Sequence, residues 1–107
     1  MHASVFAALG DETRLRLVGR LSGGAALSIS ELSGGSRLTR QAITKHLRVL
    51  ENAGLVEGTR RGREMRFRFT PGPVGEARDY LDAVSSQWER ALTRLKSFVE
   101  AGADKTR

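Results

Sequence analysis

Hydrophobic residues recur along this chain mostly with the spacing of amphipathic helices. A short apolar run at residues 4–9 predicts a first helix. Asp11 is a residue type favoured at helix N-caps, so a second helix is expected from there to about residue 21. Its apolar face carries Leu17, Val18 and Leu21, and its mostly solvated side carries Arg14, Arg16 and Arg20. The glycine pair at 23–24 predicts the end of this helix.

Two further helices are expected on either side of a second glycine pair. Ser28 and Glu31 have the spacing of a capping box, which predicts the start of a third helix. The glycines at 34–35 should end that helix after about two turns. A fourth helix should begin at Thr39 and end before Gly54. Its apolar stripe follows the i, i+4, i+7 spacing of Ile43, Leu47 and Leu50.

The period changes to two at residues 65–69, which predicts a strand with one buried face. A preceding strand should include residues 55–56, and the segment 61–63 should form the tip of a hairpin. Residues 25–27 are a candidate for a single short strand. The buried face of the later strand carries Met65, Phe67 and Phe69, and its outer face carries Arg66 and Arg68.

The last element is a long amphipathic helix that follows a Pro/Gly break at residues 70–73. Pro73 suits its first turn, and its apolar positions recur at steps of three and four for about six turns. A frayed tail is expected at residues 102–107. The apolar stripe consists of Val74, Ala77, Leu81, Val84, Trp88, Leu92 and Leu95.

This order of elements predicts a mostly α fold with a small β-hairpin, the winged helix-turn-helix. It has about five helices and a two-stranded wing. With 107 residues, the chain has the length of one domain, expected at residues 1–101. The stripe on the last helix is longer than a small core needs, and exposed stripes of that kind usually meet a partner. A dimer is therefore expected, and a stripe used only in the core of the monomer is the alternative.

The net charge of +6 is confined to one part of the chain. Residues 37–68 carry nine Lys and Arg against three acids, and the remaining residues carry nine of each sign. A charge excess limited to one helix and one hairpin matches a polyanion, and double-stranded DNA is the partner that we expect. A winged-helix module whose basic wing docks an acidic protein is the alternative.

The fourth helix presents polar side chains suited to DNA recognition. A recognition helix fits the major groove, and its N-terminal half, here starting at Thr39, reaches the base edges. Arg40 can pair with guanine and Gln41 with adenine, while Thr44 can form hydrogen bonds or contact a thymine methyl group. The phosphates are better partners for Lys45 and Arg48. A solvated polar face is the alternative.

Three arginines at the hairpin tip, Arg60, Arg61 and Arg63, can grip phosphates or enter a minor groove. Arg66 and Arg68 should contribute less. Charge that protects an edge strand against aggregation is the alternative for all of them.

The residue chemistry argues against catalysis and against a bound cofactor or metal. The chain has no cysteine, and its two histidines, His2 and His46, are far apart in the sequence. A Ser/His/Asp set and a phosphate-binding loop are both missing, so we do not expect an enzyme. His46 has two interpretations, a phosphate contact or a packed structural histidine. No apolar run is long enough to span a membrane, and a cytoplasmic location is expected.

Three segments, GDETRLRLV, SELSGGSRLTRQAITKHLRVLENAGLV and RRGREMRFRF, resemble the ArsR-type family of bacterial winged-helix repressors. The resemblance covers about residues 4–100. It implies a homodimer formed by the first and last helices, with Val5 and Phe6 in the interface. It also implies an operator whose binding represses transcription, with release by a ligand or another signal. By matching position, the DNA contacts would be Thr39, Arg40, Gln41, Thr44 and His46, with Arg61 and Arg63 at the wing tip.

This chain departs from the metal-sensing members of that family. Those members place cysteines in the helix that matches residues 29–34, where this chain has serines and a glutamate. Other members use Asp and His pairs on the last helix, and here residues 74–100 contain Asp79 and Asp82 but no histidine. An unidentified small-molecule inducer, or none, is therefore expected in place of a metal.

Overall fold

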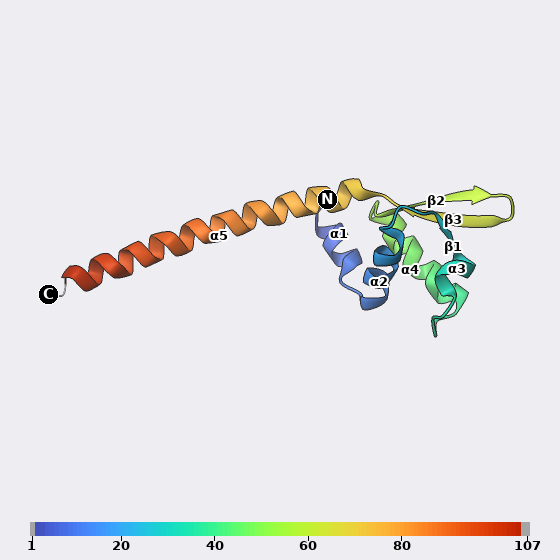
Figure 1. The fold of residues 1–107 in the computed structure, drawn as a ribbon, viewed down its shortest axis with the longest axis horizontal. Helices are drawn as coiled ribbons and strands as arrows, with labels where there is room; N and C mark the ends of the chain where they lie inside the picture. Colours follow the sequence, from blue (N-terminus) through green and yellow to red (C-terminus); the bar gives the residue numbers. More distant parts are fainter. Residues whose placement is uncertain (1, 106–107) are drawn as a thin grey trace. The chain divides into compact units, whose positions relative to one another are not determined.

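The computed structural model describes residues 2–105, with side chains described for residues 3–102. It contains five helices and three short strands in the order of the winged helix-turn-helix (Figure 1). The chain divides after Ala77 into two compact units, and the last helix continues from one into the other. The elements are α1 (His2–Leu9), α2 (Glu12–Leu21), β1 (Leu27–Ser28), α3 (Ile29–Ser33), α4 (Arg40–Asn52), β2 (Val56–Arg61), β3 (Glu64–Phe69) and α5 (Pro71–Lys105).

The sheet has one strand more than the sequence predicts. β1 pairs antiparallel with β3, with Leu27 opposite Phe67, so the order of the strands is β1-β3-β2. The predicted short strand at 25–27 is therefore present, but it begins two residues later, ends one residue later, and joins the wing. β2 and β3 form the hairpin, and Gly62 adopts the positive φ of 64° that its tight turn requires.

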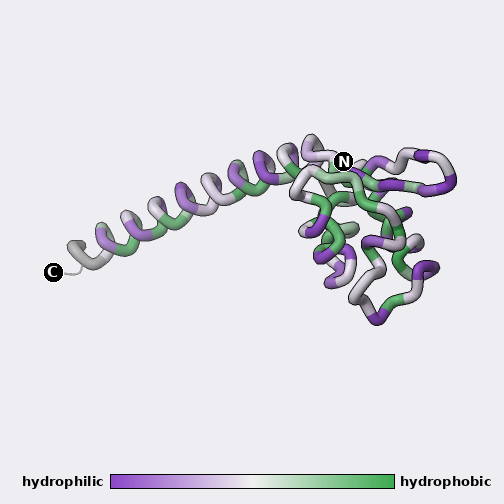
Figure 2. Tube along the Cα trace, turned by 45° about the vertical axis from the view of Figure 1, so that its right-hand side comes forward, coloured by the Kyte–Doolittle hydropathy of each residue, from purple (hydrophilic) through white to green (hydrophobic). Residues whose placement is uncertain are grey.

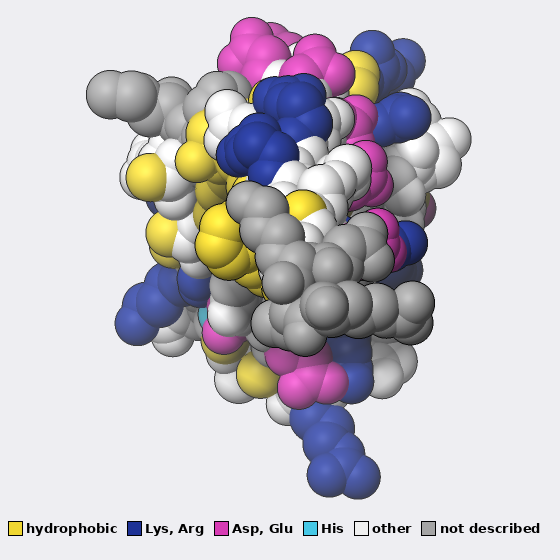
Figure 3. Space-filling model, turned by 90° about the vertical axis from the view of Figure 1, so that its left-hand side faces the viewer, with side chains coloured by type: hydrophobic (Ala, Val, Ile, Leu, Met, Phe, Trp, Pro, Cys, Tyr) yellow, Lys and Arg dark blue, Asp and Glu magenta, His cyan; other side chains and the backbone are white. Residues whose placement is uncertain are grey.

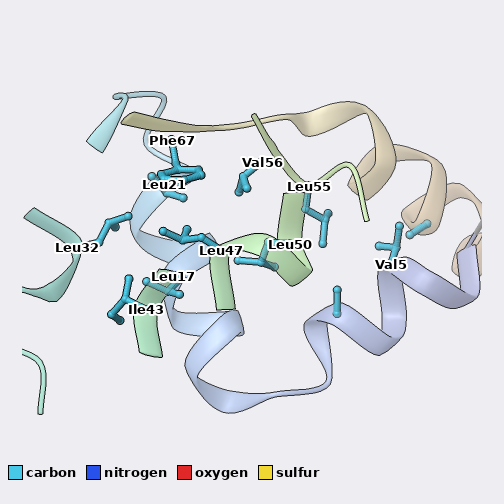
Figure 4. Close-up of a cluster of buried hydrophobic side chains, with 12 residues drawn as sticks. Val5, Leu17, Leu21, Leu32, Ile43, Leu47, Leu50, Leu55, Val56 and Phe67 are labelled. Atoms are coloured by element: carbon cyan, nitrogen blue, oxygen red, sulfur yellow. The ribbon is translucent and has the colours of Figure 1, made fainter. Parts of the chain in front are cut away.

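The hydrophobic core lies in the first unit, where α1 to α4 and the sheet meet (Figure 4). The apolar stripe of α4 is fully buried, as the sequence predicts. Val5, which the family resemblance implies in a dimer interface, is a core residue of the single chain with 4% of its surface exposed. Phe6 is half-buried and packs against the same core. The core consists of Val5, Ala8, Leu17, Leu21, Leu32, Ile43, Leu47, Leu50, Leu55, Val56, Phe67 and Ala77.

Helix caps fix where α2, α3 and α4 begin. The Asp11 carboxylate accepts a hydrogen bond from the backbone N–H of Arg14 at 3.0 Å. Ser28 and Glu31 form the complete capping box of α3, with both bonds at 3.1 Å. Thr39 caps α4 by accepting from the N–H of Ala42 at 3.0 Å. These predicted starts are all confirmed.

The caps shift the pKa values of two carboxyl groups. The backbone N–H of Arg14 holds the pKa of Asp11 below its usual value, because the hydrogen bond favours the charged form. The N–H of Ser28 lowers the pKa of Glu31 in the same way, with help from the Ser28 hydroxyl.

Two of the three α2 arginines that the sequence predicts to be mostly solvated also donate hydrogen bonds to other helices. Arg14 donates from Nε to the carbonyl oxygen of Ala8 at 2.6 Å, so it caps the C-terminal end of α1. Arg20 donates to the carbonyl oxygens of Leu32 and Glu31 at 2.8 and 3.0 Å, at the end of α3. Arg16 and Arg20 are exposed, as expected, whereas Arg14 is half-buried. Arg16 pairs with Glu12 one turn away.

The bounds of α5 differ from the prediction at both ends. The helix begins at Pro71, two residues before the predicted start at Pro73, and the proline is tolerated because a first-turn N–H has no partner in a helix. It continues past Gly102 to Lys105, so the expected frayed tail is helical this far. Residues 106–107 lie outside the described residues.

In the second unit, one side of α5 carries an exposed apolar stripe. Figure 2 shows hydrophobic positions recurring along one side of this helix, and Figure 3 shows hydrophobic side chains gathered at the surface. Trp88 is 66% exposed and Phe98 is 77% exposed, whereas Val84 is half-buried. The exposed members are Tyr80, Leu81, Trp88, Leu92, Leu95, Phe98 and Val99. No helix among residues 2–105 is long and apolar enough to cross a membrane.

Truncating the core stripe of α4 should destabilise the fold. Leu47 is fully buried, so Leu47→Ala should lower the free energy of unfolding by about 2–5 kcal/mol, measured by urea denaturation. Val49 lies on the same helix but is 41% exposed, and Val49→Ala should cost less than about 1 kcal/mol. Equal losses for the two variants would contradict the burial pattern.

Acid should destabilise the first unit through its caps. The lowered pKa values of Asp11 and Glu31 mean that the folded state binds protons less readily than the unfolded state. Their contribution is therefore present above the usual carboxyl range and is lost as the pH falls through and below about 4. We expect Asp11→Asn/Glu31→Gln to lose less stability than wild type between about pH 5.5 and about pH 3.5 in urea denaturation.

Glu76→Gln provides the control, because Glu76 is an exposed acid of α5 outside the caps described above. It should keep the pH dependence of the wild type. A double variant with the same pH dependence as the wild type would show that the caps do not contribute.

Candidate nucleic-acid interface

One face of α4 presents polar side chains to solvent along most of the helix. Gln41, Lys45 and Arg48 are exposed, and steps of four and three residues keep them on one side. Asn52 continues the same row and is exposed as well. The buried stripe lies on the opposite side, so packing fixes this face toward solvent. Asn52 is a candidate contact that the prediction missed, although the same helical count would have found it.

The two threonines of the predicted interface also serve the helix itself. Thr39 uses its hydroxyl oxygen for the N-cap, and the Thr44 hydroxyl donates to the carbonyl oxygen of Arg40 at 2.8 Å. The Thr44 proton is therefore engaged, which leaves its oxygen lone pair and its methyl group for a partner. Arg40 is exposed at the first position of the helix.

His46 points toward α2. Its Nδ1 atom lies 3.8 Å from a carboxylate oxygen of Asp11, and its side chain is only 24% exposed. Asp11 also caps α2, so this contact joins the recognition helix to the start of the neighbouring helix. Of the two interpretations that the sequence left open, this position favours the packed histidine.

The wing carries the second group of basic side chains. Arg60, Arg61 and Arg63 are all exposed around the turn at Gly62. Arg66 is half-buried, and its guanidinium donates to the Glu64 carboxylate at 3.3 Å. Part of its charge is therefore compensated within the wing, which agrees with a smaller role for Arg66.

Arg37 adds a further positive charge before α4. It is exposed in the turn between α3 and α4. Arg37 contributes to the charge of the basic segment but is not among the predicted contacts, because it lies outside both the helix and the hairpin. Within the part of the chain that the structure describes, no cluster of three or more His, Asp or Glu side chains could hold a metal ion.

The comparisons with known proteins agree with this geometry. A helix-turn-helix domain model matches residues 9–59. The HTH-type transcriptional regulator Rv2034 of Mycobacterium tuberculosis is 33% identical over 92% of this chain and 89% of its own length. The uncharacterized HTH-type transcriptional regulator YuzN of Bacillus subtilis is 40% identical over 66% of this chain and 84% of its own length.

A solved structure extends the agreement to the fold. An ArsR-like transcriptional regulator from Rhodococcus sp. RHA1 is 40% identical, with 91% of each chain covered and a TM-score of 0.79. These relatives are transcriptional regulators rather than enzymes. The chain therefore belongs to the ArsR-type family of winged helix-turn-helix proteins and is a DNA-binding transcriptional regulator.

Proposed function

We propose that this regulator is a homodimeric repressor that binds an inverted-repeat operator in the cytoplasm. The observation that carries the proposal is the pairing of a solvent-facing polar row on α4 with an arginine-rich wing. Base-reading and phosphate-binding side chains are then present on two elements of one small unit. A module that docks an acidic protein would not need the amide groups of Gln41 and Asn52 in the α4 row.

Different side chains of α4 would contact the bases and the phosphates of DNA. Gln41 and Arg40 lie in the N-terminal half, from which a recognition helix reaches base edges in the major groove. Lys45 and Arg48 are exposed further along and suit the phosphates. The three exposed arginines of the wing would grip an adjacent stretch of backbone or a minor groove.

The exposed stripe of α5 supports the dimer. Large apolar side chains repeated along one helix cost free energy in water and are usually covered by a partner. Leu81, Val84, Trp88, Leu92 and Leu95 are the predicted contacts, and Phe98 and Val99 extend the same exposed surface. A two-fold axis would place two recognition helices roughly 34 Å apart, one turn of DNA.

Release from DNA would depend on a signal other than a metal bound by cysteines. The chain has no cysteine, so a thiolate site is excluded. We propose an unidentified small-molecule inducer, and simple autoregulation without an inducer is the alternative.

Sequence-specific binding is tested by fluorescence anisotropy on two duplexes. One carries the DNA upstream of the protein's own gene, and the other carries the same bases shuffled. Gln41→Ala should weaken binding to the first duplex by about 1–3 kcal/mol and leave binding to the second unchanged. Arg61→Ala/Arg63→Ala should weaken binding to both and reduce the log–log salt slope by about 2.

Wild-type protein on both duplexes is the reference for these variants. Equal losses for Gln41→Ala on the two duplexes would refute its role in base reading. Weak wild-type binding that is identical on both duplexes and vanishes with salt would refute an operator in this DNA.

The dimer is tested by analytical ultracentrifugation at micromolar concentration. The wild type should sediment as a dimer, and Trp88→Ala should shift the equilibrium toward the monomer. Trp88 is mostly exposed in the single chain, so its truncation should leave the first unit folded. Arg90→Ala, an exposed polar position on the same helix, should leave the dimer intact. A monomeric wild type would overturn the homodimer.

A further inference from the structure

Glu51 is an acidic residue in a place that two physical rules disfavour. It lies in the last turn of α4, where the helix dipole favours cations over carboxylates. It also lies within the basic segment 37–68, where every acid weakens the attraction for DNA. A residue that breaks local rules usually has a compensating role.

The Glu51 carboxylate is held against the wing. Its Oε2 atom accepts a hydrogen bond from the backbone N–H of Gly58 at 3.3 Å, in a partly buried position. Gly58 lies on β2, opposite Phe67 of β3. β2 is an edge strand of the three-stranded sheet, so no neighbouring strand pairs with it on its outer side. The Glu51 carboxylate accepts the hydrogen bond that the Gly58 N–H donates there.

The glycine at position 58 makes this approach possible. A Cβ atom there would lie 3.0 Å from the Glu51 Oε2 atom and 2.9 Å from Cε1 of Phe67. Both distances are shorter than van der Waals contact, so a side chain would displace the carboxylate or the buried ring. Because Gly58 has no Cβ atom, the Glu51 carboxylate can approach the Gly58 N–H. The two residues thereby form a contact between α4 and β2.

The other two acids of the basic segment have different surroundings. Glu64 accepts from the guanidinium of Arg66 within the same strand. Glu57 is exposed on β2, across the strand pair from Arg68. Among the three acids of the basic segment, Glu51 is the one whose described hydrogen bond joins the recognition helix to the wing. The base of the wing also shares the hydrophobic core with α4 through Val56 and Phe67, so the Glu51 bond adds a polar contact to this packing.

We propose that Glu51 is a positioning residue for DNA binding, which holds the wing at a fixed angle to the recognition helix through the N–H of Gly58. A helix in one groove and a hairpin in the next must keep a set spacing to bind together. The contact supplies this spacing three residues before the wing arginine Arg61. The inference rests on the proposed role of the wing arginines.

The sign of the mutational effect separates this role from simple electrostatics. Removing a negative charge next to bound DNA should strengthen binding if charge alone matters. If Glu51 positions the wing, Glu51→Ala should weaken binding by about threefold to tenfold, the loss expected for one such hydrogen bond. Its salt slope should also fall toward that of Arg61→Ala/Arg63→Ala, because fewer phosphates are neutralised.

Two further variants isolate the hydrogen bond from the charge. Glu51→Gln keeps an acceptor oxygen without the charge, so it should retain most of the wild-type slope. Gly58→Ala keeps every charge but crowds both the carboxylate and the Phe67 ring, so the folded variant should lower the slope as Glu51→Ala does. Glu57→Ala is the matched control, since it removes an exposed acid of the same wing and should bind DNA as tightly as wild type or more tightly.

The experiment measures anisotropy of the full chain on the duplex from upstream of its gene, at several salt concentrations. Circular dichroism and thermal melting confirm that each variant is folded. In the Arg61→Ala/Arg63→Ala background, adding Glu51→Ala should cause a smaller further loss than it does in the wild type, because only Arg60 of the three wing arginines remains to contact DNA.

Tighter or unchanged binding by folded Glu51→Ala, with a wild-type slope, would overturn the inference while the arginine variant still binds weakly. If Arg61→Ala/Arg63→Ala itself binds like wild type, the proposed role of the wing fails, and the positioning role fails with it. These two results are distinguishable because the arginine variant is measured independently.

Discussion

Burial of one apolar stripe on α4 is the interaction on which the rest of this molecule depends. Ile43, Leu47 and Leu50 have at most 1% of their surface exposed. Each such side chain contributes about 1.5–3 kcal/mol when it leaves water. The stripe fixes the rotation of α4 about its own axis, and the helical period then turns Gln41 and Lys45 to solvent. The solvent-facing polar row proposed to read DNA is thus a geometric consequence of the core.

Polar groups hold the ends of the helices around this core. Arg14 caps the end of α1, and Arg20 caps the end of α3, so two cations of α2 satisfy carbonyl oxygens of other helices. Asp11 caps α2 and lies beside His46 of α4. These side chains join helices that a small core of this size would hold less firmly. Part of the charge outside the basic segment therefore has a structural use.

Within the basic segment, the arginines and the acids have opposite effects on the attraction for DNA. Exposed arginines around Gly62 attract a polyanion, and every acid nearby reduces that attraction. Glu64 compensates Arg66 inside the wing, and Glu51 contacts the edge of β2. A wing that is thin enough to reach DNA has few apolar contacts of its own, so polar contacts at its base contribute to its orientation.

The sequence by itself determined the elements whose causes are local. The capping box at Ser28, the N-caps at Asp11 and Thr39 and the buried stripe of α4 depend on neighbours within a few residues, and the structure confirms them. Only the tertiary structure decided what depends on partners far along the chain: the pairing of β1 with β3, the burial of Val5, the contact of His46 with Asp11 and the reach of Glu51 to Gly58. The three pairwise contacts join residues 7 to 40 positions apart on different elements, and periodicity carries no information about which elements meet.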